Sequence, residues 1–541
     1  MAANWDLGLI PTTIDNTIIP GGTVNPLILN VDVSIVDFEV QNGATVTMDG
    51  MDLVISGTLS NEGTITLFGN ENLSITTPDG DSGTFVFLGD GNGGSVTYTL
   101  PDFGSVDFFN LVINDTNATM DNFDTSDTLT VNGTLQVASS TLDTSANADT
   151  VLVGGALIVD GGTLTATNST VDVGGDVRLS AGTFTAPDVT GTLFVGGDFD
   201  HSTGGTFVNS GGVVVFDGLS QGITGDVDTT FTTLTKVTLV PDTFTFSTAS
   251  TQTVSGTLQL EGTMGGVLSI DSDSSGVQAG LTLLPGGIQQ LNWLSVTDND
   301  ASGGLLLAPM NSVEFISGTT TNWDFDGADV TWEGDVSSDW ENPMNWDLGF
   351  VPGPNDHAII PPVATQPILT ANVMIDQLTL DPGATTVMLE DYNMLVSGTL
   401  SNDGTITLFG NQTYSFGLPD SDSGLFIFLG DGDGSADTYL ITEQGTFDFY
   451  NVIINDVNAT MDSFTTTGSL VFAGTLSLSS STLDISTLMG NLSVGGSLII
   501  DGGQLLSTSG TLNVDGGVAV ISGTLSAPGA GLSFTVGDDW T

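Results

Sequence analysis

Short acidic turns are the residues of this sequence whose types and spacing point most directly to chemistry. Each turn carries aspartate or asparagine at alternate positions beside glycine, and each occurs once in either half of the chain. The residues are Asp79, Asp81, Asp90 and Asn92, followed by Asp420, Asp422, Asp431 and Asp433. Oxygen ligands at alternate positions of a glycine-containing turn are how short loops wrap Ca²⁺. We therefore predict Ca²⁺ as the one cofactor, while noting that Asp, Asn and Gly also form turns without any ion.

Side chains suited to acid–base catalysis are scarce. The only basic residues are Arg178 and Lys236, and the only histidines are His201 and His357. A β-helix polysaccharide lyase would need a Lys or Arg base beside a carboxylate–calcium cluster. Paired aspartates could still act as the acid and base of a glycosidase. We predict no catalytic residues and no enzyme, and keep a polysaccharide-degrading β-helix enzyme as the alternative.

The composition limits the partners. The chain has 64 acidic residues against 2 basic ones, a formal net charge of −62, and no cysteine. Nucleic acids and anionic membranes both require Lys or Arg, so neither is an expected partner. Disorder also requires low hydrophobicity, whereas 39% of these residues are hydrophobic. The sequence therefore predicts a folded, very acidic protein whose self-repulsion is relieved by salt or divalent cations.

A long internal repeat organises the chain. The motif Asn-Trp-Asp-Leu-Gly begins at Asn4 and again at Asn345, so the offset is 345 − 4 = 341, and later segments match at the same offset. A catalytic group needed by each copy should occur twice, but Arg178 aligns with Ala519. We expect a repeat without gaps, one whole unit followed by 541 − 341 = 200 residues of a second. Because the second copy stops within the unit, we expect an excerpt from a longer array.

Within each unit the hydrophobic pattern has a period of two, which is typical of β-strands. Val-x-Val-Gly-Gly or a close variant begins at Val151, Val171 and Leu193, and each occurrence is followed by a Gly-Thr-Leu or Gly-Thr-Phe strand. One coil of roughly 20 residues cannot bury its own apolar face, but stacked coils can. The sequence therefore predicts an all-β, right-handed parallel β-helix (β-solenoid).

Tryptophan marks the expected boundary between the units. We predict a first β-helical unit at 1–325, a Trp- and Pro-rich seam at 326–352 and a second, truncated unit at 353–541. The residues assigned to packing at the seam or its counterpart are Trp5, Trp323, Trp332, Trp340 and Trp346. A solenoid must cover the open strand edges at its ends, and bulky aromatic residues suit that role.

The Asn-Trp-Asp entry motif, the Val-x-Val-Gly-Gly coils and the Asn-Trp-Asp-Phe exit motif at 322–325 resemble right-handed parallel β-helix repeats of large bacterial extracellular proteins. Such proteins include haemagglutinin-like adhesins, autotransporter-type passengers and surface-filament proteins. The resemblance implies an extracellular or cell-surface structural or adhesive protein. It implies self-association, end to end or side by side, and cell-surface glycans as partners. A self-assembling filament or surface-layer subunit that joins end to end is a further alternative, beside the enzyme. No signal peptide and no apolar run of transmembrane length occur in this chain.

Overall fold

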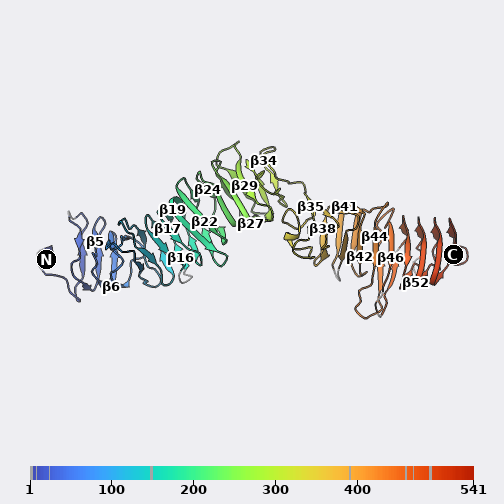
Figure 1. Ribbon diagram of the computed structural model, residues 1–541, viewed down its shortest axis with the longest axis horizontal. Coiled ribbons are helices and arrows are strands. Elements are labelled where there is room, and N and C mark those ends of the chain that lie inside the picture. Colours follow the sequence, from blue (N-terminus) through green and yellow to red (C-terminus); the bar gives the residue numbers. More distant parts are fainter. Residues whose placement is uncertain are drawn as a thin grey trace. The chain divides into compact units, whose positions relative to one another are not determined.

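The computed structural model describes residues 4–541 except 8, 23–24, 146–149, 389–391, 457, 459, 467 and 487–489. Parallel strands stack as a β-solenoid of about 23 turns, with almost no helix (Figure 1). The all-β, parallel β-helix prediction is confirmed, and its right-handed sense stays a prediction. A short 3₁₀ turn, η2 (Pro343–Asn345), lies in the described part of the second unit.

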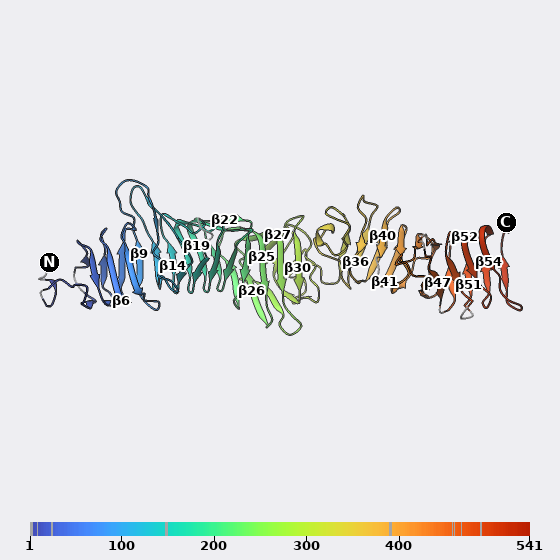
Figure 2. The same cartoon turned by 90° about the horizontal axis from the view of Figure 1, so that it is seen from below.

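The chain forms two compact units, Met1–Trp323 and Asp324–Thr541. The segment 326–352, expected to be a seam of its own, belongs to the second unit. In each unit the strands lie side by side along that unit's own axis (Figures 1 and 2).

The strands of the first unit form three parallel sheets. The five-stranded sheet contains β1 (Thr17–Ile19), β3 (Val33–Ile35), β4 (Phe38–Val40), β6 (Leu53–Asn61) and β8 (Leu73–Thr77). The largest sheet contains β2 (Leu27–Ile28), β5 (Thr45–Thr47), β7 (Thr64–Leu67), β9 (Thr84–Phe87), β10 (Thr97–Thr99), β11 (Asn110–Ile113), β12 (Asn122–Asp124), β14 (Leu135–Val137), β15 (Thr141–Asp143), β17 (Leu157–Thr165), β19 (Val177–Asp188), β21 (Phe199–His201), β22 (Gly205–Ser210), β24 (Gln221–Thr224), β26 (Asp242–Phe246), β28 (Leu268–Ser272), β31 (Leu294–Val296) and β33 (Val313–Glu314). The third contains β13 (Leu129–Val131), β16 (Thr150–Val153), β18 (Thr170–Val173), β20 (Thr192–Val195), β23 (Val213–Phe216), β25 (Thr229–Val237), β27 (Thr251–Glu261), β29 (Ala279–Leu283), β30 (Ile288–Asn292), β32 (Asn299–Asp300) and β34 (Thr320–Thr321).

The second unit repeats this plan. Its first sheet contains β35 (Asp329–Thr331), β36 (His357–Ile360), β38 (Val373–Ile375), β39 (Gln377–Leu380), β41 (Met394–Asn402) and β43 (Tyr414–Leu418). Its second contains β37 (Ile368–Leu369), β40 (Thr385–Met388), β42 (Thr405–Leu408), β44 (Leu425–Phe428), β45 (Thr438–Ile441), β46 (Asn451–Ile454), β47 (Ser463–Thr466), β49 (Leu476–Leu478), β50 (Thr482–Asp484), β52 (Leu498–Leu506) and β54 (Val518–Ser526). Its third contains β48 (Leu470–Phe472), β51 (Leu492–Val494), β53 (Leu512–Val514) and β55 (Phe534–Val536).

Columns of apolar side chains form the core. Each member of a column pairs in register with the next, and each is almost completely buried. One column of the first unit runs through Val46, Ile65, Phe85, Leu111, Leu135, Leu157, Val177 and Phe199. Alternate residues of a strand point to opposite faces, so the polar residues between them remain at the outer surface. Burying each such side chain contributes about 1.5–3 kcal/mol, which stabilises a stack that no single coil could hold.

The structure corrects the prediction of a repeat without gaps. Most strands of the two copies correspond at one constant offset, for example β6 and β41, where 394 − 53 = 341. However, β3 and β38 correspond at 373 − 33 = 340. Accordingly Val33 pairs with Leu53, where 53 − 33 = 20, whereas Val373 pairs with Met394, where 394 − 373 = 21. The one-residue deletion lies between β2 and β3, where loop residues tolerate length changes without disturbing the strand pairing, and the compensating insertion follows β40, where residues 389–391 lie outside the described residues.

Candidate functional site

The first pair of acidic turns joins neighbouring coils. The carboxylate of Asp79 accepts the backbone N–H of Asn61, one coil earlier, at 2.5 Å, and that of Asp81 at 3.1 Å. In the second copy Asp420 accepts the N–H of Asn402 at 2.7 Å and that of Asp422 at 2.9 Å. The oxygens of Asp79 and Asp420 are therefore already engaged in holding the turn to the stack. Asp420 has a lowered pKa as a result: burial alone would raise it, but the N–H groups of Asp422 and Asn402 outweigh burial.

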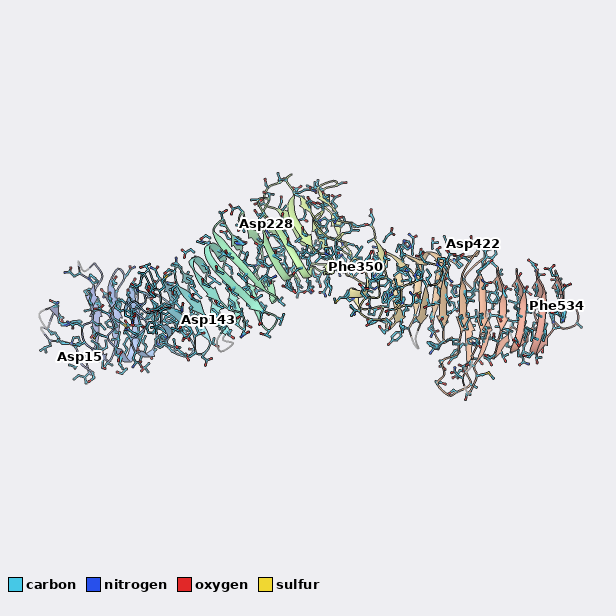
Figure 3. The ribbon with its side chains drawn as sticks, in the orientation of Figure 1. Asp15, Asp143, Asp228, Phe350, Asp422 and Phe534 are labelled. Atoms are coloured by element: carbon cyan, nitrogen blue, oxygen red, sulfur yellow. The ribbon has the colours of Figure 1, made fainter. Side chains whose placement is uncertain are left out.

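The surface aspartates of these turns do not converge with other acids. Asp81 and Asp422 lie at the surface, and Figure 3 labels Asp422 on the outside of its unit. In the described part of the chain, neither belongs to a group of three carboxylates close enough to share an ion.

The second pair of turns differs between the copies. Among the described residues, the acidic side chains that converge are Asp431, Asp433 and Asp437, whose ligand oxygens all lie within 4.8 Å of one another. Gly432 and Gly434, with φ of +70° and +93°, let the backbone curl around them. Three carboxylates of this kind are suitable ligands for Ca²⁺.

The first copy lacks this triad. Its residues at the three positions are Asp90, Asn92 and Val96, so only one carboxylate remains. The Asn92 side-chain amide instead donates to Asp90 at 2.6 Å. The N–H of Asn92 and the Tyr98 hydroxyl also donate to Asp90 and hold its pKa below the usual value. In the second copy, the predicted cation site therefore consists of Asp431 and Asp433 together with Asp437. In the first copy, the predicted ligands Asp90 and Asn92 instead hydrogen-bond to each other.

Buried aspartates hold these acidic turns in place. We call them bridging aspartates because each carboxylate accepts backbone N–H groups from two places in the chain. They are Asp107, Asp115 and Asp121 in the first unit and Asp448, Asp456 and Asp462 in the second, all no more than 1% exposed. Asp462 accepts the N–H groups of Asp431 and Asp437 at 3.1 and 2.9 Å, and so fixes both ends of the triad turn.

The bridging aspartates serve a segment that leaves the regular coil. The segment after β9 stands out from the stack in Figure 2, and its counterpart after β44 stands out in Figure 1. Asp107 accepts the N–H groups of Phe103 and Thr130, both at 2.8 Å, and Asp448 does the same for Gln444 and Val471 at 2.6 and 2.7 Å. Burial raises the pKa of Asp107 and of Asp448, against the opposing effect of these hydrogen bonds.

Tyrosine completes the network in both copies. The hydroxyl of Tyr439 donates to Asp431 at 2.5 Å, as that of Tyr98 donates to Asp90 at 2.7 Å. Burial and the neighbouring carboxylates raise the pKa of both tyrosines, so they remain protonated donors. The sequence prediction missed Tyr439, Asp437 and the bridging aspartates. The recurrence of the tyrosine and the bridging aspartates at the offset of the long repeat was a signal that could have identified them.

The basic and imidazole side chains all have structural partners. Lys236 is 1% exposed and lies 2.8 Å from Asp242. Arg178 pairs with Asp176 at the surface at 2.7 Å. The ring of His201 contacts Thr229 and the carbonyl of Gly205, and burial lowers its pKa. His357 lies 2.8 Å from both Asp329 and Thr379.

Three of the five predicted packing tryptophans meet. Trp332, Trp340 and Trp346 are at most 2% exposed, and the ring of Trp346 lies 5.1 and 4.8 Å from the other two. Trp323 belongs to the first unit, where its indole N–H donates to Asn299 at 3.0 Å. Trp5 is half-buried near the start of that unit.

No protein-family model, curated protein or solved structure matches this chain. Among the described residues, no helix has the length and apolar character needed to cross a membrane.

Proposed function

We propose that the protein is an extracellular structural or adhesive repeat protein, in which each β-solenoid unit serves as a stiff acidic rod at a cell surface and Ca²⁺ stiffens or bridges these rods. The observation that carries this proposal is that the buried polar and charged side chains hold the backbone of the stack together. The bridging aspartates, kept in both copies, hold backbone segments together. The basic and imidazole side chains are engaged in ion pairs and hydrogen bonds.

The proposed Ca²⁺-binding site is the triad of Asp431, Asp433 and Asp437. A net charge of −62 favours divalent cations at the surface in any case, and the triad adds one place where three ligands converge. Binding at the triad would stabilise the folded second unit by mass action.

The test is thermal unfolding in millimolar Ca²⁺ and in EDTA at constant ionic strength. A higher melting temperature in Ca²⁺ than in Mg²⁺ at the same concentration is the expected result. Equal melting temperatures in Ca²⁺ and EDTA would refute a specific site. Binding of the same preparation to immobilised cell-surface glycans tests adhesion, and absence of binding would leave only the structural role.

A second candidate is a filament or surface-layer subunit that joins end to end. The edge of β1 favours it, because within the described residues β1 pairs with β4 alone, and an unpaired strand edge can pair with another chain. The enzyme alternative, a polysaccharide-degrading β-helix, is tested by incubating the chain with acidic polysaccharides. Product release that a single Asp→Ala change abolishes would establish it in place of the structural role.

A further inference from the structure

A lysine lies in the core of the first unit. Lys236 belongs to β25 and is 1% exposed, and its neighbours in the core column, Phe216 and Leu260, are fully buried. A primary amine in such a place is shielded from water, and lysines become nucleophiles when they are desolvated. The groups around its Nζ atom therefore decide whether it is only a buried cation.

The carboxylate of Asp242 lies directly beside this amine. Asp242 begins β26, the strand that follows β25 in the chain (Figure 2), and its Oδ2 atom lies 2.8 Å from Lys236 Nζ. Both side chains are 1% exposed. Among the described residues Oδ2 has no hydrogen bond of proper geometry, the contact with Nζ included. One oxygen of the carboxylate is thus held against the amine and is engaged by no other donor.

The other oxygen of Asp242 accepts two backbone hydrogen bonds. Oδ1 accepts the N–H of Ser220 at 2.7 Å and the N–H of Thr243 at 2.8 Å. Two N–H groups on one oxygen form the arrangement that stabilises an oxyanion when a nucleophile attacks the carbon beside it. The two oxygens of this carboxylate therefore differ, because Oδ1 is placed to carry negative charge and Oδ2 is free to leave.

Two further acceptors orient the amine. Nζ donates to the carbonyl of Gly218 at 2.5 Å and to Oε1 of Gln221 at 2.7 Å. The side-chain nitrogen of Gln221 donates to the carbonyls of Val195 and Gly197, so its oxygen faces the lysine. Two of the three ammonium hydrogens are engaged in this way, which leaves the third for Oδ2 of Asp242. Transfer of that proton frees the nitrogen lone pair beside the carboxyl carbon.

The turn between the two residues is anchored at both ends. The N–H of Thr238 donates to the carbonyl of Glu261 at 2.9 Å, and the N–H of Asp242 donates to that of Val267 at 3.2 Å, both on the next coil. Inside the turn, the Thr238 hydroxyl donates to the carbonyl of Val240 at 2.7 Å. Two reacting groups held in a productive orientation reach effective concentrations of about 10⁵–10⁸ M. The fold therefore supplies the proximity that a condensation needs.

We propose that Lys236 and Asp242 condense to a side-chain amide, an isopeptide bond that links β25 to β26. A proton passes from the ammonium group to Oδ2, the freed Nζ lone pair attacks Cγ, and Oδ1 carries the negative charge between the N–H groups of Ser220 and Thr243. A second proton then moves from nitrogen to the Oδ2 hydroxyl, the Cγ–Oδ2 bond breaks and one water leaves. The new Nζ–Cγ bond replaces the C–O bond, and no other reactant is required.

Burial favours the amide over the ion pair. Two charges are costly to keep in an apolar core, and the amide removes both of them. Burial opposes the charged carboxylate of Asp242, but hydrogen bonds from Lys236, Ser220 and Thr243 hold its pKa below the usual value. The neutral pair that reacts is therefore a minor state, the conversion is slow, and a freshly prepared chain retains the ion pair seen in the structure. The bond goes beyond the proposed function, because it depends on neither Ca²⁺ nor a partner.

Trypsin provides the test, because it cuts after lysine and arginine and this chain has one of each, Lys236 and Arg178. The purified chain is incubated for days near neutral pH, and samples are unfolded in urea and digested. We expect the cut after Arg178 throughout, and a share of uncut fragment 179–541 that grows with time, because an acylated lysine has lost the charge that trypsin recognises. The intact mass of the same chains should fall below the sequence mass by one water.

Two variants separate the bond from other causes. Lys236→Arg keeps a trypsin site at this position, but a guanidinium does not lose its proton in proteins and cannot attack the carboxyl carbon. It should retain its full mass and be cut into 179–236 and 237–541. Lys236→Met with Asp242→Asn replaces both charged groups, which a folded core tolerates, and it should lose no water.

Complete cutting after Lys236 at every time would overturn the proposal, as would resistance to trypsin without the loss of one water. Loss of ammonia instead of water would identify Gln221 as the group that reacts, and would equally overturn it. A loss of water that the double variant also shows would place the dehydration elsewhere in the chain, with the same consequence.

Discussion

Removing the ammonium group of Lys236 should destabilise the middle of the first unit. Lys236 occupies a core column between Phe216 and Leu260, a position at which the neighbouring coils carry apolar side chains. Its ammonium group donates to the carbonyl of Gly218 at 2.5 Å and to Gln221 at 2.7 Å, and pairs with Asp242 at 2.8 Å. Lys236→Met leaves that carboxylate buried without its cation.

The expected cost follows from the burial of the pair, since both side chains are 1% exposed. Removing one partner of such an ion pair costs about 3–5 kcal/mol, whereas replacing both is close to neutral. Burial alone would raise the pKa of Asp242, but hydrogen bonds from Lys236, Ser220 and Thr243 hold it below the usual value. In the double variant with Asp242→Asn, the asparagine oxygen can still accept from Ser220 and Thr243. The double variant should therefore recover to within about 1–2 kcal/mol of the original chain.

Hydrogen–deuterium exchange of β23 to β26 is the appropriate assay, because long repeat arrays need not unfold in one step. A loss of about 3–5 kcal/mol predicts exchange roughly 150-fold to 4,600-fold faster in Lys236→Met. Unchanged protection in Lys236→Met would show that the buried ion pair does not stabilise this part of the first unit. A double variant that exchanges as fast as the single one would show that the unpaired carboxylate is not what destabilises Lys236→Met.

Further predictions concern the triad, the bridging aspartates and the covering layer, by which we mean the segment 328–340 whose strand β35 pairs with β36. Asp433→Asn with Asp437→Val gives the second copy the residues of the first, and it should abolish the Ca²⁺-dependent rise in melting temperature. A rise that persists would place the ion elsewhere. Because burial raises the pKa of groups such as Asp448 above 3.8, the folded state binds protons more readily than the unfolded chain. The contribution of Asp448 to the free energy of unfolding should therefore become more favourable as pH falls toward its raised pKa, and calorimetry in 0.5 M NaCl in which Asp448→Asn shows the same pH dependence of melting temperature as the original chain would contradict this. Trp332→Ala should destabilise the second unit by about 3–5 kcal/mol, whereas Trp5→Ala should cost less than about 1 kcal/mol because Trp5 is half-buried. Urea unfolding that gives equal losses for the two would argue against the covering layer.

The fold could be predicted from the sequence because its determinants are local and repeated. Apolar residues alternate with polar ones, and the Val-x-Val-Gly-Gly pattern recurs at short, nearly equal intervals, as at Val151, Val171 and Leu193. Inward residues that recur at such intervals must stack, and the register of Val151 on Val171 and Val171 on Leu193 confirms it. The compensated one-residue shift near Val33 was missed although the sequence carries its signal, since Gly43-Ala44-Thr45 and Gly383-Ala384-Thr385 match at 383 − 43 = 340.

The candidate site was predicted only in part, because convergence depends on distant residues. The alternate-position pattern identified Asp431 and Asp433 but not Asp437, whose backbone is held by Asp462, 25 residues further on. The same pattern selected Asp79, whose carboxylate is used by the N–H of Asn61 on the previous coil. Spacing along the chain cannot distinguish an oxygen that faces an ion from one that already accepts a backbone donor.

Negative-stain electron microscopy of the purified chain in millimolar Ca²⁺ and in EDTA, at the same ionic strength, tests the structural role most directly. We expect particles that join or align in Ca²⁺ and separate again when chelator is added. Separate particles of one size in both conditions would contradict it.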